Sequence, residues 1–255
     1  MSANEWLAVA AISVGFSLGL PLVYRFSERF GTSAEVARKM IHVAMGLACA
    51  AFPWIFDRAF PVWVLAGIAT LLLGFIRLFP VLKNGFGSVL HGIKRPSYGE
   101  VLFAPAVAVV FALADGDRFL YLIPILILTI ADAAGAVVGT RWGRQFYSSG
   151  GGFKTIEGSM IVLLTAFLCG FLTLLFGGRA DVLHSLWIGL ILGTLAMMVE
   201  GISDRGFDNI VIPVGCYMIL ERLIVLDMPS LMGRFVVLLV LVILVLIGSR
   251  WSTLN

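Results

Sequence analysis

Long apolar runs separated by short polar joins make up most of this 255-residue chain. A helix needs about 20 mostly apolar residues to cross the hydrocarbon core of a bilayer, so each long run is predicted to be a membrane span. The predicted spans lie near residues 5–24, 40–56, 60–80, 100–116, 118–138, 158–178, 182–203, 209–227 and 231–249. The pattern therefore predicts an all-α fold, a polytopic membrane bundle of about nine transmembrane helices.

The composition excludes a soluble protein, because 60% of the residues are apolar and only 13% are charged. A single integral-membrane domain over residues 1–255 is expected, and the first apolar run is interpreted as a retained span because no basic segment precedes it. The 3 cysteines lie in apolar runs without C-x-x-C spacing and are interpreted as buried small residues. No nucleic-acid partner is expected, and the oligomeric state is left open.

Basic residues are distributed unevenly among the joins. The joins after the first, third, fifth and seventh spans hold 11 Lys and Arg residues, and the other joins hold 4. Because Lys and Arg are enriched in cytoplasmic joins, the richer side is predicted to be cytoplasmic, with the N-terminus outside and the C-terminus inside. The unusual polar residues are then expected in loops on the cytoplasmic face.

An acid interrupts the fifth span. Asp132 lies about two turns from the predicted cytoplasmic end, and Ala136 and Gly139 follow on the same face. A carboxylate near hydrocarbon costs several kcal/mol, so such residues usually mark function, and the small residues allow a neighbouring helix to approach. The alternative is a structural aspartate hydrogen-bonded within the bundle.

The following join contains a glycine-rich, basic loop at residues 150–155. It differs from a P-loop, because Phe153 rather than glycine precedes Lys154 and no strand is predicted before it. Backbone N–H groups followed by a lysine nevertheless suit the binding of phosphates. The alternative is a flexible connector, although Glu157, three residues after Lys154, favours a site.

The first cytoplasmic join is predicted to start a helix that carries charge into the second span. Residues 32–35 fit a capping box, so the helix is expected to begin near Ser33. Arg38 and His42 lie on one face of this helix, with His42 inside the membrane boundary. Lys39 is interpreted either as an interfacial anchor or as part of the site.

Three acids occur at four-residue intervals at the end of the seventh span: Glu200, Asp204 and Asp208, followed by Asn209. Oxygen ligands without a His or Cys cluster are typical of magnesium bridged by phosphates. The alternative is a polar cap between two spans. Asp132 is included with these three acids as a candidate metal ligand.

Four elements, in this order, resemble the CTP-dependent lipid-alcohol kinases, a family that comprises phytol and farnesol kinases, dolichol kinases and CTP-using diacylglycerol kinases. The elements are Arg38-Lys39-x-x-His42-x-x-x-Gly46, Asp132-Ala133 with Gly139, Lys154-Thr155-x-Glu157-Gly158-Ser159, and Glu200 with Asp204, Asp208, Asn209 and Pro213. The resemblance covers about residues 35–215. The pair Gly99-Glu100 is similar to a further family position, more loosely.

The resemblance implies transfer of the γ-phosphate of CTP, with Mg²⁺, to the hydroxyl of a lipid alcohol in the membrane. It implies catalytic roles for Asp132, Lys154, Arg38 and His42. The residues implied in nucleotide binding are Lys39, Gly150, Gly151, Gly152, Lys154, Thr155, Glu157, Gly158, Ser159 and Asn209. Phosphoryl transfer relies on positioning and charge neutralisation, which a basic loop at the membrane surface can supply.

Two other functions are considered. The Lys-Thr-x-Glu-Gly and Asp-Arg-x-x-Asp elements are also similar to the phosphatidate cytidylyltransferases, but this chain lacks the Gly-His-Gly-Gly run that usually precedes their Asp-Arg. A transporter would place charges near the midplane and often carries an inverted repeat. Here the polar residues gather at one face and no repeat is detected. The kinase is therefore favoured.

Overall fold

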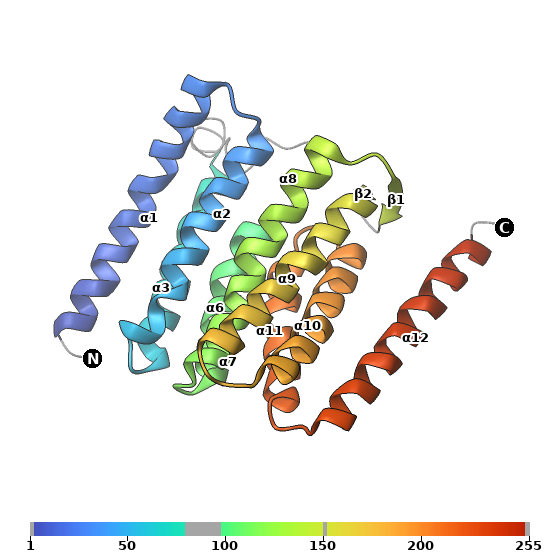
Figure 1. Ribbon diagram of the computed structural model, residues 1–255. Helices are drawn as coiled ribbons and strands as arrows, with labels where there is room; N and C mark the ends of the chain where they lie inside the picture. Colours follow the sequence, from blue (N-terminus) through green and yellow to red (C-terminus); the bar gives the residue numbers. More distant parts are fainter. Residues whose placement is uncertain (1–2, 80–97, 150–151, 253–255) are drawn as a thin grey trace.

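Helices lying side by side form the computed structural model, which describes residues 3–79, 98–149 and 152–252 (Figure 1). The helices are α1 (Ala3–Phe30), α2 (Ala34–Ala50), α3 (Ala59–Leu78), α6 (Gly99–Ala114), α7 (Arg118–Leu126), α8 (Asp132–Trp142), α9 (Ile156–Phe176), α10 (Val182–Ile202), α11 (Asp208–Leu223) and α12 (Met228–Ser252). A short 3₁₀ turn (Phe52–Trp54) follows α2, and a π-helical turn (Ile127–Ala131) joins α7 to α8. The predicted all-α class is confirmed.

Six helical segments in the described residues are long and apolar enough to cross a membrane: Ala3–Phe30, Ala59–Leu78, Arg118–Trp142, Ile156–Phe176, Val182–Ile202 and Met228–Gly248. The other three predicted spans overlap α2, α6 and α11, which have 17, 16 and 16 residues. At 1.5 Å per residue these shorter helices extend about 25 Å, less than the hydrocarbon core. The count of nine spans and the orientation stay predictions.

The outer surface of the bundle is apolar, as contact with lipid requires. Large side chains such as Leu7, Leu71 and Val225 are 71%, 75% and 79% exposed. Helices α1 and α12 flank the bundle (Figure 1), and in α1 only Val9 and Leu20 are buried. Because an aqueous protein would not leave so many large apolar side chains exposed, the chain is an integral membrane protein.

Helix α2 begins where the sequence predicted, because the Ser33 side chain accepts a hydrogen bond from the backbone N–H of Val36. The capping box itself does not form as expected. The cap is Ser33 rather than Thr32, and the Glu35 carboxylate pairs with Arg38 at 2.7 Å. Ion pairing with Arg38 therefore replaces the predicted return of Glu35 to the backbone.

The join between α8 and α9 contains an antiparallel hairpin of β1 (Phe146–Ser149) and β2 (Gly152–Thr155). The expectation that no strand precedes Lys154 is therefore wrong, because Lys154 lies within β2, opposite Tyr147. The hairpin is held against the end of α10, where the Ser149 hydroxyl donates to the carbonyl oxygen of Gly201 at 2.9 Å. This tertiary contact is not visible in the local sequence pattern.

Glycines allow α9 and α10 to pack closely. Gly170 faces the Cα atom of Gly189, and Gly193 faces the backbone of α9. A Cβ atom added at Gly193 would lie 2.7 Å from the carbonyl oxygen of Leu163 and 3.0 Å from the amide nitrogen of Phe167. Backbone atoms within a helix cannot move aside cheaply, so this position requires glycine.

We predict that Gly193→Ala lowers the free energy of unfolding by about 1–3 kcal/mol, because the added methyl overpacks the contact between α9 and α10. The measurement is the thermal denaturation midpoint of the protein in detergent. Gly67→Ala on α3 is the matched control, since no atom lies within 4 Å of the Cβ position there. Equal midpoints for the two variants would contradict the close packing.

Candidate active site

Most of the predicted site residues line one cavity of about 510 Å³. This volume lies in the usual range for pockets that bind small molecules and cofactors. The cavity is formed by the N-terminal parts of α2, α9 and α11, by α8, by the hairpin and by the end of α10. The predicted residues that line it are Arg38, Lys39, Asp132, Lys154, Thr155, Gly158, Ser159, Glu200, Asp208 and Asn209.

A buried ion pair between α2 and α8 forms one wall of the cavity. The Lys39 ammonium lies 2.6 Å from Asp132 Oδ2, and the two side chains are only 5% and 11% exposed. His42 Nε2 lies 3.4 Å from the same oxygen. Of the two interpretations of Lys39, an interfacial anchor or a site residue, the structure favours the second.

The π-helical turn before Asp132 explains the position of His42. Such turns widen the helix and interrupt its regular hydrogen-bond pattern, frequently at functional sites. Here the carbonyl oxygen of Leu128 accepts a hydrogen bond from His42 Nε2 at 3.0 Å. Since a carbonyl oxygen can only accept, Nε2 carries the hydrogen in this arrangement. Gly46, one turn further along α2, packs against Thr129 in the same turn.

A second ion pair joins the hairpin to the end of α10. Lys154 Nζ lies 2.7 Å from Glu200 Oε1 and also donates to the Glu200 backbone carbonyl. The Ser159 hydroxyl lies 3.5 Å from Glu200 Oε2 and 2.7 Å from the Tyr147 hydroxyl. The sequence predicted a flexible loop around Lys154, but the structure places this lysine in β2, with its ammonium group on Glu200 at the end of α10.

A tight turn between α10 and α11 places Asp208 and Asn209 in the cavity wall. Arg205 and Gly206 have positive φ angles of 52° and 85°, which reverses the chain between α10 and α11. A positive φ is uncommon for a residue other than glycine, and strained backbone is often found at functional sites. The turn brings Asp208 and Asn209, at the start of α11, into the cavity wall, together with Arg205.

Close contact between α8 and α9 forms the floor of the cavity. A Cβ atom at Gly158 would lie 3.0 Å from the carbonyl oxygen of Gly135 and 3.2 Å from the Cα atom of Gly139. Thr155 caps α9 by accepting from the Gly158 amide at 3.2 Å. The predicted approach of a neighbouring helix through small residues is thus confirmed at Gly139, and the other contact residue is Gly135, which was not part of the predicted face.

Some predicted residues lie elsewhere. His42 lies behind Asp132, and Gly152 begins β2. The Glu157 carboxylate lies outside the cavity and accepts a hydrogen bond from the backbone N–H of Gln145 at 3.3 Å. The Asp204 carboxylate lies 3.5 Å from Arg205 and does not line the cavity. Gly150 and Gly151 lie outside the described residues.

The proposed magnesium ligands do not form a closed site by themselves. Within the described residues, no three His, Cys, Asp or Glu side chains lie close enough together to hold a metal ion. The carboxylates of Asp132, Glu200 and Asp208 do line the same cavity. Oxygen donors from one or two carboxylates, completed by phosphates and water, are the usual ligands of magnesium, so these residues fit an ion that arrives with a nucleotide.

The sequence did not indicate several residues of the cavity. Phe146 and Phe153 line it from the hairpin although they are 66% and 75% exposed, and Thr140 lines it from α8. Had the two strands been predicted, two exposed aromatic residues on them would have indicated a ligand-binding surface. Glu100 lies outside the cavity, where its side chain is 7% exposed and pairs with Arg77 at 3.2 Å.

One comparison with known proteins gives a relative of similar length. A phytol kinase from Synechocystis sp. is 30% identical over an alignment of 230 residues, and the alignment covers 86% of this chain and 92% of the relative. No protein-family model matches the chain, and no solved structure is significantly similar to it.

The likeness to this kinase extends over nearly the whole of both sequences. The two ion pairs, Lys39 with Asp132 and Lys154 with Glu200, both line the cavity of about 510 Å³. The chain therefore belongs to the lipid-alcohol kinase family.

Proposed function

We propose that the protein transfers the γ-phosphate of CTP to the hydroxyl of a prenyl alcohol of the phytol type, giving the lipid monophosphate. The observation that carries the proposal is the cavity, in which Arg38, Lys39, Lys154 and Arg205 face the same space. Four cations around one space suit a triphosphate. The acceptor class rests on the 30% identity to the phytol kinase, and the donor rests on the motif resemblance.

In the proposed mechanism the bound nucleotide replaces the partners of the two lysines. Lys39 and Lys154 now neutralise Asp132 and Glu200. A triphosphate in the cavity would draw both ammonium groups towards phosphate oxygens and leave both carboxylates facing the ligand. Once the nucleotide is bound, the two ammonium groups already point at the phosphates, so the side chains need to move little when negative charge develops on the transferred phosphoryl group.

Glu200 and Asp208, with the Asn209 amide nearby, would hold magnesium together with the phosphates. When bound, the ion supplies neutralisation of phosphate charge. Asp132 would accept the proton of the acceptor alcohol, because it lines the polar cavity and its Oδ2 lies 3.4 Å from His42, a buried residue of α2. The alcohol oxygen forms the bond to the γ-phosphorus, the bond to the β-phosphate oxygen breaks, and CDP leaves. The cavity is proposed to open to the cytoplasm.

An assay with γ-labelled nucleotide tests the function. Purified protein in detergent is given magnesium, labelled CTP or ATP, and phytol, farnesol, geranylgeraniol, dolichol or diacylglycerol. We expect label in the monophosphate of phytol or of another prenyl alcohol, with CTP preferred. Absence of labelled lipid, together with pyrophosphate release from phosphatidate and CTP, would instead identify a cytidylyltransferase.

Replacing Lys154 by alanine is predicted to raise the KM for the nucleotide about 10- to 100-fold, the effect of losing one hydrogen bond to a charged group. The KM for the alcohol should stay within about threefold of the wild-type value. Arg179→Ala is the control, since Arg179 pairs with Asp117 in loops away from the cavity. A Lys154→Ala protein with unchanged nucleotide KM would rule out the assigned role.

The buried pair permits a test that separates stability from catalysis. Lys39→Met leaves the Asp132 carboxylate buried without its partner, which should cost about 3–5 kcal/mol of unfolding free energy. The double variant Lys39→Met/Asp132→Leu should recover much of this stability but remain inactive. Asp132→Asn alone should lower kcat about 100-fold or more. Activity in the folded double variant would show that the pair is structural.

A further inference from the structure

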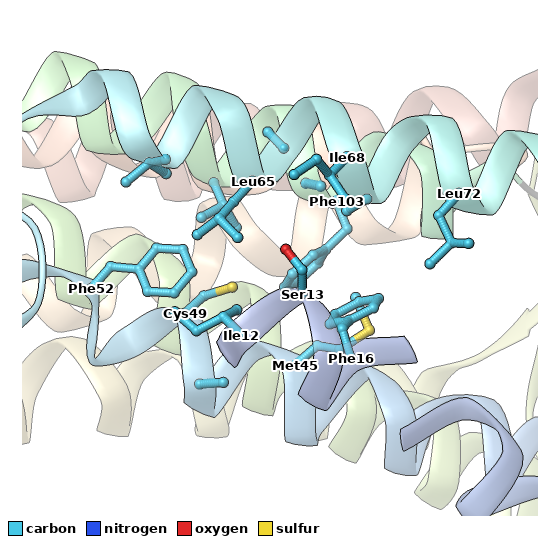
Figure 2. Close-up of a pocket in the computed structure, with 16 residues that line it drawn as sticks. Ile12, Ser13, Phe16, Met45, Cys49, Phe52, Leu65, Ile68, Leu72 and Phe103 are labelled. Carbon is cyan, nitrogen blue, oxygen red and sulfur yellow. The ribbon is translucent and has the colours of Figure 1, made fainter. Parts of the chain in front are cut away.

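A second cavity, almost entirely apolar, lies between α1, α2, α3 and α6, and nothing in the proposed chemistry uses it. Figure 2 shows its labelled side chains extending along α3 from Phe52 past Leu65 and Ile68 to Leu72. Ser13 carries the one hydroxyl among the lining residues. Its volume is about 60 Å³. Such a surface suits hydrocarbon and not nucleotide.

Two side chains connect this apolar cavity to the polar one. Phe103 lines the apolar cavity, and its ring contacts the imidazole of His42 edge to face, with 5.0 Å between the ring centroids. His42 in turn lies 3.4 Å from Asp132, which lines the polar cavity. The two cavities are therefore separated by the thickness of about two side chains.

The apolar cavity extends away from the polar site along α2. Met45, Ala48 and Cys49 line it on successive turns after His42, and Phe52 lines its far end. Ala50, the last residue of α2, lies eight residues after His42, which is about 12 Å at 1.5 Å per residue, and Phe52 follows in the 3₁₀ turn. The cavity also communicates with the bilayer, because Ala48 and Ile68 line it and are exposed at the outer surface.

We propose that this cavity holds the hydrocarbon tail of the acceptor alcohol, so that its depth determines which tail lengths are phosphorylated. The proposal rests on the proposed function, since it assumes that a lipid hydroxyl is the acceptor. A tail in the cavity would place its hydroxyl end at the His42–Phe103 wall, with the His42 imidazole between it and Asp132. Movement of these two side chains would bring the hydroxyl to the carboxylate. Burial of each methylene contributes about 0.8 kcal/mol of transfer free energy from water, and much less from lipid. The cavity therefore acts by positioning the alcohol rather than by extracting it from the membrane.

Helix α1 is the wall that can yield to admit a tail. Its buried contacts are few, Val9 and Leu20. A Cβ atom at Gly15 or Gly19 would meet no atom within 4 Å, so the helix is not locked to its neighbours at these positions. An outward shift of α1 would enlarge the cavity without breaking the ion pairs of the polar site, which lie on other helices.

The test is a substitution that fills the part of the cavity furthest from His42. Cys49 lies seven residues after His42, about 10 Å along the helix, and its side chain points into the cavity in Figure 2. We expect Cys49→Phe to lower kcat/KM for geranylgeraniol at least tenfold and that for the shorter geraniol less than threefold. Leu47→Phe adds the same ring nearby on α2, on a residue that is 51% exposed and outside the cavity. This control should keep the wild-type preference.

A second readout does not depend on turnover. The alkylation rate of Cys49 by N-ethylmaleimide, followed by mass spectrometry of its peptide, should fall several-fold with geranylgeraniol and little with geraniol. The half-buried Cys169, which does not line the cavity, reports on general detergent effects. Unprotected Cys49 would overturn the proposal, as would a Cys49→Phe enzyme with an unchanged length preference. A wild-type protein that phosphorylates no alcohol would overturn the proposed function, whereas protection of Cys49 would still locate a tail.

Discussion

The ion pair between Lys39 and Asp132 is the interaction on which the arrangement of this site depends. Each charge alone would cost roughly 3 kcal/mol or more inside a membrane helix. Paired at 2.6 Å they tolerate burial, and the pair joins α2 to α8 across 93 residues of sequence. The π-helical turn and the contact of Gly46 with Thr129 bring α2 close enough for this pair to form. The packing of α2 against α8 and the pairing of charges in the site therefore depend on each other.

Under the proposed function, paired charges would also explain how a highly charged nucleotide can bind at a membrane surface. A cluster of free cations would be costly to keep close together, and free carboxylates would repel a triphosphate. In this cavity Lys39, Lys154 and Arg38 each have an acidic partner: Asp132, Glu200 and Glu35. The site is then nearly neutral before the nucleotide arrives, and exchange of partners supplies cations to phosphate and carboxylates to magnesium in the proposed mechanism.

Much of this site was predictable because it contains acidic residues at places where an apolar membrane span normally has none. Asp132 in an apolar span and three acids at the end of another indicated function without any knowledge of tertiary contacts. The partners were less accessible: Lys39 had two equally good interpretations until α2 and α8 were seen together. The hairpin was missed because residues 146–155 carry glycine and serine signals typical of loops. Its strands are held in place by a long-range contact, the hydrogen bond from Ser149 of β1 to Gly201 of α10. Local patterns located the acids, and long-range packing determined their partners.

The two cavities place a polar and an apolar compartment on either side of a wall formed by His42 and Phe103. A lipid alcohol has the same division, with one hydroxyl at the end of a long hydrocarbon, and under the two proposals it would meet its phosphate donor only where the two compartments touch. Helix α2 contributes to both, since Arg38 and Lys39 line the first and Met45, Ala48 and Cys49 line the second. Under the two proposals, this single helix therefore sets the distance between Arg38 and Lys39, which would bind phosphate, and the place where a tail would lie. A change in its register would move both together, so the hydroxyl and the donor would keep their relation even if the depth of the site in the membrane varied.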